Sequence, residues 1–332
     1  MFKKITICFL SIAVILTSTL PVFAETDPDE TRENYIKWID FTPTTAALKD
    51  SLTYDIDTHD QALHLSWIEL LALVAAQNGG DFSNYKSSQM KTFAEKLAEG
   101  NTSESLCSNS KLYRYYLEAY TAILGGMVGN FEAVKIIEDG REMREMSYGL
   151  RVFSPIASGY YYNDYDDFGV SRSYGYKRRH LGHDIMGSVG TPIVAVESGY
   201  VEACGWNQYG GWRIGIRSFD GKRYYYYAHL RKNHPYNDIY EGKIINAGEV
   251  IGYLGMTGYS AKENVNNIDV PHLHYGLQII FDPSQKDGWN QIWVDMYALT
   301  AFLSQNRAPT VISSDEKERK STVYYVYSET PD

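Results

Sequence analysis

Residues 212–228 read WRIGIRSFDGKRYYYYA, in which two runs rich in β-branched and aromatic residues flank an Asp-Gly pair. Such runs favour β-strands, and Asp-Gly favours the tight turn of a hairpin. Other strand-like runs lie at 191–196, 199–203, 250–254 and 272–280. They are separated by Gly, Asp and Asn, which favour turns and loops. From about Gly149 onward we therefore expect mostly antiparallel β structure with long loops.

The first half of the chain has a helical pattern instead, with apolar residues recurring every three or four positions from Thr44 to about Met146. The candidate helices run from Leu63 to Val74, from Met90 to Leu97 and from Leu112 to Leu124. Mixed charges over 138–145 predict a solvated helix that joins the two halves. The predicted fold class is α+β multidomain, with an N-terminal helical bundle followed by a mostly antiparallel β domain.

The expected domain boundaries follow these changes in sequence pattern. Lys3 and Lys4 precede an apolar run and a small residue at Ala24, the pattern of a secretory signal cut after Ala24. An uncleaved N-terminal anchor is the alternative. We expect a secreted, extracellular or cell-envelope protein with no membrane span in the mature chain. The expected parts are a signal peptide over 1–24, a helical domain of unassigned role over 25–148, the β-rich domain over 149–305 and a C-terminal tail over 306–332, largely solvated with room for one edge strand.

Composition narrows the function classes. The chain has 332 residues, a net charge of −10 and 22% charged residues, which is typical of a globular protein. It has no Lys/Arg-rich block, so we expect no nucleic-acid partner. Cys107 and Cys204 show no metal-type spacing, and a disulfide and two free thiols both stay open.

Four histidines and one aspartate of the β-rich half form the candidate site. On a strand, His272 and His274 project from the same face because side chains alternate. His180 and Asp184 are four residues apart, and imidazole and carboxylate are ordinary Zn²⁺ ligands. Two histidines and one carboxylate leave a fourth position for water, as a catalytic zinc site requires. A further histidine, His229, follows the tyrosine-rich strand.

The order of these motifs closely resembles the lysostaphin/LytM-type zinc metallopeptidases. The resemblance covers about Val170 to Leu277, roughly a third of the chain, and leaves the helical half outside. It identifies residues 149–305 as a LytM-like zinc metallopeptidase domain. The segments that carry it, in order, are 180–184 (HLGHD), 190–195 (GTPIVA), 205–211 (GWNQYGG), 227–230 (YAHL), 248–258 and 271–274 (PHLH).

The resemblance implies a role for each site residue. His180, Asp184 and His274 are the expected ligands of one zinc ion. His272 is the expected general base that takes a proton from the zinc-bound water, and His229 is expected to stabilise the tetrahedral intermediate. The implied activity is that of a zinc metalloendopeptidase, with the peptides of bacterial peptidoglycan as the usual substrate; no protein partner is implied.

The sequence departs from the family pattern in two respects. His183 stands where the family commonly has an apolar residue, and we expect a structural or supporting role rather than a further metal ligand. The loops over 231–241 and 262–270 are longer than the family's minimal loops, and loops around a groove commonly set specificity. Which peptide bond is cut therefore stays open. Two alternatives also stay open: a non-catalytic LytM-like interaction module of the envelope, and a zinc peptidase acting on Gly-rich proteins.

Overall fold

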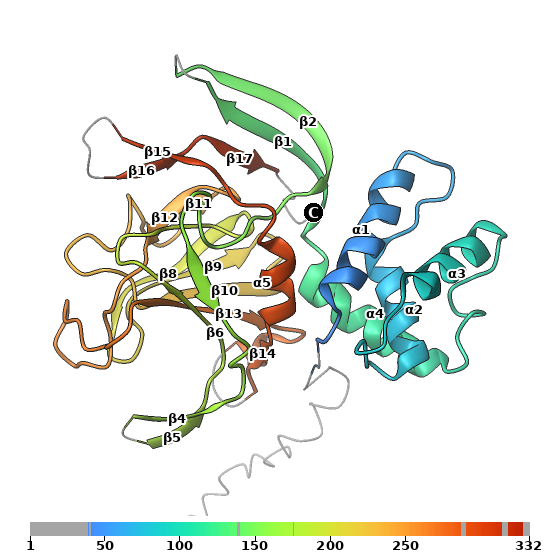
Figure 1. The fold of residues 1–332 in the computed structure, drawn as a ribbon, viewed down its shortest axis with the longest axis horizontal. Helices are drawn as coiled ribbons and strands as arrows, with labels where there is room; N and C mark the ends of the chain where they lie inside the picture. The colour runs from blue at the N-terminus through green and yellow to red at the C-terminus, as the bar shows by residue number, and fades with distance from the viewer. Residues whose placement is uncertain are drawn as a thin grey trace, which may run out of the picture. The chain divides into compact units, whose positions relative to one another are not determined.

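The computed structural model in Figure 1 describes residues 39, 41–137, 140–174, 176–286, 290–313 and 318–327. All described residues belong to one compact unit, Ile36–Asp332. The predicted signal peptide lies outside the described residues. Over the residues described, no helix combines the length and the apolar character needed to cross a membrane.

Four helices occupy the first part of the described chain. They are α1 (Thr45–Thr58), α2 (Trp67–Asn78), α3 (Ser87–Ala98) and α4 (Ser110–Leu124). Helix α2 contacts the other three and is buried from Leu70 to Ala76, because its side chains are apolar on every face. The three predicted helices are present, but the first begins at Trp67, so Leu63 lies outside it and is exposed.

The segment that follows is a β-hairpin, and the predicted solvated helix over 138–145 is wrong for its described residues, 140–145. Strands β1 (Val128–Ile136) and β2 (Glu142–Leu150) pair antiparallel, and β17 (Val323–Val326) pairs with the other edge of β1. The charges that suggested a helix pair across the strands: Arg144 Nη1 lies 2.6 Å from Glu132 Oε2. Residues two apart on a strand point to the same face. The mixed charges of this segment are therefore compatible with a strand as well as with a helix.

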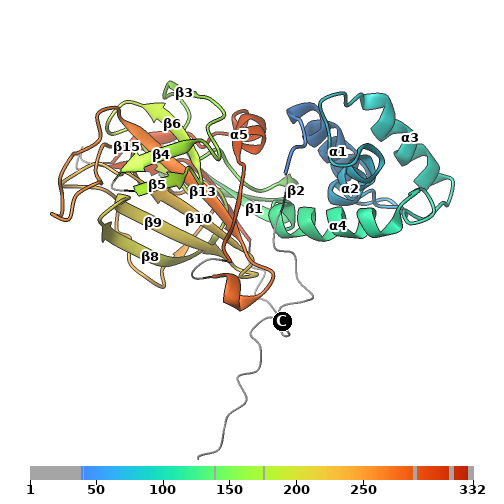
Figure 2. The same cartoon turned by 90° about the horizontal axis from the view of Figure 1, so that it is seen from below.

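The second part of the chain contains an eight-stranded sheet. Its order is β11-β8-β9-β10-β13-β6-β3, with β14 also paired to β13, and the pairs are antiparallel, as predicted. Figure 2 shows β8, β9, β10 and β13 side by side. The strands are β3 (Tyr162–Asp164), β6 (His183–Gly187), β8 (Gly199–Asn207), β9 (Gly211–Ser218), β10 (Arg223–Ala228), β11 (Ile244–Ile245), β13 (His272–Ile279) and β14 (Ile292–Val294).

Smaller elements surround this sheet. They are the hairpin β4 (Ser171–Tyr174) and β5 (Tyr176–Arg179), the pair β7 (Pro192–Val194) and β12 (Val250–Tyr253), the pair β15 (Thr310–Ile312) and β16 (Arg319–Ser321), the 3₁₀ turn η1 (Pro283–Gln285) and helix α5 (Tyr297–Leu303). The predicted strands at 191–196 and 250–254 therefore pair with each other outside the main sheet.

The alternation of side chains on β10 separates the core from the site. Tyr225 and Tyr227 are fully buried on the core face, whereas Tyr224 and Tyr226 lie on the opposite face with His272 and His274 of the neighbouring strand. The strand period of two is the cause, since neighbours in sequence point to opposite faces.

The C-terminal residues are part of the fold. Ala308 is fully buried and Tyr327 nearly so, and the Tyr327 hydroxyl accepts a hydrogen bond from the backbone N–H of Ser198 at 2.9 Å. One edge strand was expected in the tail, but its described residues form three short strands. Val311 and Ile312 are exposed, as expected for a solvated segment, whereas Ser313 and Tyr327 are buried. Cys107 and Cys204 are free thiols, which settles the question that spacing left open.

Candidate metal centre and the groove around it

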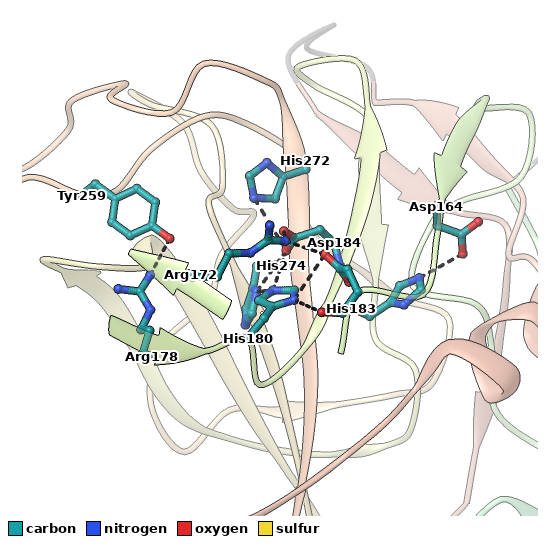
Figure 3. Close-up of polar contacts among 10 residues, drawn as sticks. Asp164, Arg172, Arg178, His180, His183, Asp184, Tyr259, His272 and His274 are labelled. Carbon is teal, nitrogen blue, oxygen red and sulfur yellow. Dashed lines mark hydrogen bonds and ion pairs between the residues drawn. The ribbon is translucent and has the colours of Figure 1, made fainter. Parts of the chain in front are cut away.

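Three side chains converge at one end of the eight-stranded sheet. Strand β6 carries Asp184, the segment before it carries His180, and β13 carries His274, which is paired in register with Asp184. His180 Nε2 lies 2.9 Å from His274 Nδ1 and 3.0 Å from Asp184 Oδ1, and His274 Nδ1 lies 3.1 Å from the same oxygen (Figure 3). The three predicted ligands thus present one atom each to a common point.

The chemistry of this trio suits a metal ion. A ring N–H points in one direction only, so no arrangement of protons makes good hydrogen bonds along all three sides of the triangle. Three lone pairs aimed at a shared cation satisfy all of them. The carbonyl of Asp167 accepts a hydrogen bond from His180 Nδ1 at 3.0 Å, which directs Nε2 toward the trio, where a metal would bind in place of the Nε2 proton.

A glycine makes room for this arrangement. A Cβ atom at Gly182 would lie 2.5 Å from His274 Cε1 and 2.6 Å from His274 Nε2. Such distances are far below van der Waals contact, so the His274 ring reaches the trio only because residue 182 has no side chain.

A second layer of side chains supports the trio. Arg172 Nη2 donates to Asp184 Oδ2 at 3.0 Å and to Asp167 Oδ2 at 2.7 Å. Asp167 is almost completely buried, and its Oδ2 also lies 3.2 Å from His180 Nδ1. Asp184 therefore offers Oδ1 to the trio while Arg172 holds Oδ2. Sequence reasoning missed Asp167 and Arg172; the available signal was the acidic run at 164–167 shortly before His180.

The other two predicted histidines lie beside the trio, each anchored by a backbone carbonyl. His272 Nδ1 donates to the carbonyl of Val270 and His229 Nδ1 to that of Thr257, both at 2.8 Å. The two ring centroids are 4.8 Å apart, and His272 Nε2 lies 3.7 Å from Asp184 Oδ1. With Nδ1 of each ring held by a carbonyl, Nε2 is the nitrogen of each ring that faces the trio.

The backbone at His229 is strained. Its φ is 62°, in the left-handed region that non-glycine residues rarely adopt. The His229 N–H donates to the carbonyl of Gly210 at 2.7 Å, and this contact together with Thr257 fixes the ring. Such strain persists where the surroundings impose it, commonly at functional sites.

Burial and neighbouring groups act on the pKa values in opposite directions. Burial would lower the pKa of His180, but hydrogen bonds with Asp167 and Asp184 outweigh it and raise that pKa to about 9. Burial would raise the pKa of Asp184, yet hydrogen bonds from His180 and His274 hold it well below its usual range. Burial lowers the pKa of His274 and of His229. Near neutral pH, Asp184 is therefore ionised and His274 and His229 are neutral.

His183 is not part of this cluster. It lies on the other side of β6 from Asp184, is nearly fully buried, and its Nε2 lies 3.0 Å from Asp164 Oδ2 (Figure 3). Its ring also packs against Tyr297, with centroids 5.5 Å apart. This agrees with the expectation of a structural role rather than a further ligand.

A groove of about 490 Å³ opens over the same face of the sheet. His229, His272 and His274 line it at one end, together with Asp184. Its floor continues over aromatic rings: Tyr226 and Trp293 meet edge to face with centroids 6.2 Å apart. The trio and the two flanking histidines therefore face a space large enough to hold a short extended peptide.

Comparison with known proteins gives the same reading of this region. Residues 178–287 match peptidase family M23. The chain is 34% identical over 186 residues to the L-Ala–D-Glu endopeptidase of Bacillus subtilis, covering 56% of this chain and 53% of that protein. It is 39% identical over 97 residues to lysostaphin of Staphylococcus simulans, covering 29% and 17%. The chain thus spans about half, or less, of the length of these relatives.

Among solved structures, a LytM protein from Ruminococcus gnavus shares the fold. The match has a TM-score of 0.53 at 23% identity and covers 84% of this chain and 95% of that one. The mostly antiparallel β fold predicted for the second half is confirmed by this likeness. The family match encloses all five residues of the histidine–aspartate set, and the chain therefore carries a peptidase family M23 domain.

Proposed function

We propose that the protein is a secreted zinc-dependent endopeptidase that hydrolyses peptide bonds in bacterial peptidoglycan. The observation that carries the proposal is the convergence of His180, Asp184 and His274 beside His229 and His272 in one groove. Relatives of this domain include enzymes named for cutting L-Ala–D-Glu and glycyl-glycine bonds, which supports a wall peptide as substrate.

The metal would be held by His180 Nε2, Asp184 Oδ1 and His274 Nδ1, a set of two imidazoles and one carboxylate that suits zinc. When bound, zinc polarises the substrate carbonyl and lowers the pKa of a water in its open position to about 7. Arg172 keeps Asp184 Oδ2 away from the metal side, so that Asp184 contributes a single oxygen.

The two flanking histidines would move the proton. His272 Nε2 takes a proton from the attacking water as the oxygen bonds to the carbonyl carbon, and the proton then passes to the leaving amine as the C–N bond breaks. His229 contributes in the same space. Its neutral ring has its proton on Nδ1, toward Thr257, so its Nε2 lone pair can accept a hydrogen bond from the hydroxyl that the water leaves on the tetrahedral intermediate and so stabilise that intermediate.

Mass spectrometry of material released from purified peptidoglycan by the full chain tests the activity. We expect fragments with a new amino terminus, loss of release with a zinc chelator and recovery on adding zinc. His274→Ala should retain no zinc and release nothing, because a ligand is gone. The exposed His59→Gln variant, on the helical side, is the matched control and should act like the parent.

Zinc retention without release of fragments from several wall types would overturn the peptidoglycan proposal. Cleavage of Gly-rich proteins under those conditions would identify a different substrate, and binding to envelope proteins without any cleavage would identify an interaction module. The secretion proposal has its own test: sequencing the amino terminus of protein recovered from the medium should give Glu25 first, and an intact Met1 would contradict the cut after Ala24.

A further inference from the structure

We propose that the groove selects peptides that carry a carboxylate, and that Lys286, which lies beside the buried pair of Arg217 and Glu202, binds this carboxylate at the end of the groove away from the metal centre. The inference names the substrate class of the endopeptidase and so rests on the proposed function for its use in hydrolysis. The binding itself is argued from the groove alone.

The charge of the groove is opposite to that of the chain. Among the described residues that line it, five are cationic and two carry carboxylates, whereas the whole chain has a net charge of −10. A bound divalent metal would add to the positive excess. The cations are Arg172, Arg178, Arg179, Arg217 and Lys286, and the carboxylates are Asp184 and Glu202. A cationic groove with apolar walls attracts anionic ligands and disfavours cationic ones.

Two of these cations share one carboxylate at the far end. Arg217 donates from Nε and Nη2 to the two oxygens of Glu202 at 2.8 and 3.0 Å, and Lys286 Nζ lies 3.2 Å from Glu202 Oε1. One positive charge is therefore in excess. Arg217 is 2% exposed, and its Nη1 has no hydrogen-bond partner among the described residues. Because that nitrogen is buried, a ligand carboxylate in the groove would balance the excess charge at the exposed amine of Lys286.

Buried side chains hold this end of the groove in a defined geometry. Gln278, which is 3% exposed, donates from Nε2 to the backbone carbonyl of Lys286 at 3.2 Å and so fixes the lysine backbone. Arg217 stacks over the Tyr224 ring, with 4.8 Å between its Cζ and the ring centroid. The Lys286 side chain is 45% exposed and is thus accessible to a ligand.

Strand register gives the distance from the bond that is cut. Tyr224 pairs with both Arg217 and Gln278, so these residues lie at one level of the floor. Gln278 follows His274 by four residues on the same strand, which is about 13 Å along β13. An extended peptide covers that length in about four residues. The recognised carboxylate should therefore lie about four residues from the scissile bond.

A binding experiment with two matched peptides tests this inference. The peptides are oligoalanines of equal length that differ only in one residue, glutamate in one and glutamine in the other. Binding to the zinc-loaded full chain is measured by fluorescence anisotropy at low and high salt. We expect the glutamate peptide to bind about fivefold to tenfold more tightly, with the preference falling as salt rises.

Variants locate the preference. Lys286→Gln should remove most of it and Lys286→Glu should reverse it, whereas Lys49→Gln on an exposed part of α1 should leave it intact. Arg217→Gln should act in the same direction, but this residue is buried, so the lysine variants decide the outcome if it fails to fold. Equal binding of the two peptides by the parent, or a full preference in Lys286→Glu, would overturn the inference.

The binding experiment tests the carboxylate site independently of the proposed endopeptidase activity. Hydrolysis of peptidoglycan without any preference for the glutamate peptide would overturn the carboxylate site and leave the endopeptidase proposal standing. A clear preference in binding without hydrolysis would support the carboxylate site and count against the endopeptidase proposal.

Discussion

At the scale of single residues, the candidate site depends on groups that hold the predicted ligands in place. Asp167 contacts both His180 and Arg172, and Arg172 contacts Asp184, so one buried carboxylate connects two of the three ligands. Partners of metal ligands commonly set the ring tautomer and the ligand orientation. Asp167 and Arg172 are thus positioning residues, and their effect should appear in metal affinity.

We expect Asp167→Asn to weaken zinc binding about 10-fold to 100-fold, because the neutral amide holds His180 and Arg172 less firmly. Competition with a chromogenic chelator measures the affinity, and the melting temperature of the zinc-free protein reports any general loss of stability. Asp164→Asn is the matched control, since Asp164 contacts His183 outside the metal centre. Equal zinc affinity in the two variants would show that Asp167 does not position the ligands.

A second residue prediction concerns the space beside His274. Gly182→Ala should lower zinc affinity at least about tenfold, since the new methyl group would overlap the His274 ring and push a ligand out of place. Gly221→Ala meets no atom within 4 Å; at its φ of 74° the change should lower stability but leave zinc affinity unchanged, because the residue lies in the turn between β9 and β10 and outside the trio. Unaltered affinity in Gly182→Ala would mean that the ring has more freedom than the structure shows.

At the scale of elements, a buried ion pair ties a helix to the sheet. Arg223 on β10 donates to both oxygens of Glu197 at 2.8 and 2.9 Å, and its Nη1 donates to the carbonyl of Ala122 at the end of α4. The Tyr225 hydroxyl also donates to Glu197 at 2.6 Å. Both members of the pair are buried, so removing Arg223 leaves the Glu197 carboxylate without a cation.

We expect Arg223→Met to lower the free energy of unfolding by about 3–5 kcal/mol, the range for breaking a buried pair. Urea denaturation followed by circular dichroism measures the change. Arg114→Met is the control, because Arg114 and Glu104 form a solvent-exposed pair, and it should leave the midpoint nearly unchanged. A loss as small as that of the control would indicate that water or a neighbouring group takes over the Glu197 contacts.

Local patterns predicted helix or strand correctly where the apolar residues followed one clear period. The apolar spacing of α3 and α4 and the Asp-Gly hairpin of β9 and β10 are present as expected. The hairpin of β1 and β2 was not predicted because the charge pattern was weighed above the alternation. Arg144 pairs with Glu142, two residues away on the same strand, and with Glu132 on the other strand. Neighbouring residues in the sequence do not indicate which residues pair across two strands.

At the scale of the whole molecule, helices and strands belong to one compact unit. The buried carboxylate of Asp55 on α1 accepts hydrogen bonds from the Trp67 N–H at 2.8 Å and from the Tyr148 hydroxyl on β2 at 2.6 Å. The described residues that line the groove all fall between Arg172 and Trp293, so α1–α4 support the fold without lining the site.

We expect a fragment that starts at Gly149 to melt at a lower temperature than the full chain from Glu25. The fragment lacks β1 and most of β2, so β17 loses its pairing partner, and Arg223 loses the Ala122 carbonyl. Calorimetry of both proteins with saturating zinc measures the difference. Equal melting temperatures would show that residues 149–332 fold without the preceding part.

The sequence by itself predicted three helices of the first part, the mostly antiparallel β structure of the second part, and the set of His180, Asp184, His229, His272 and His274. These features are encoded locally, in periodicity and in short ordered motifs. Only the tertiary structure decided the free state of Cys107 and Cys204, the support of the ligands by Asp167 and Arg172, and the pairing of β17 with β1. Those contacts join residues that are far apart in the sequence or lack a recognisable motif. The spacing of residues along the chain therefore does not predict them.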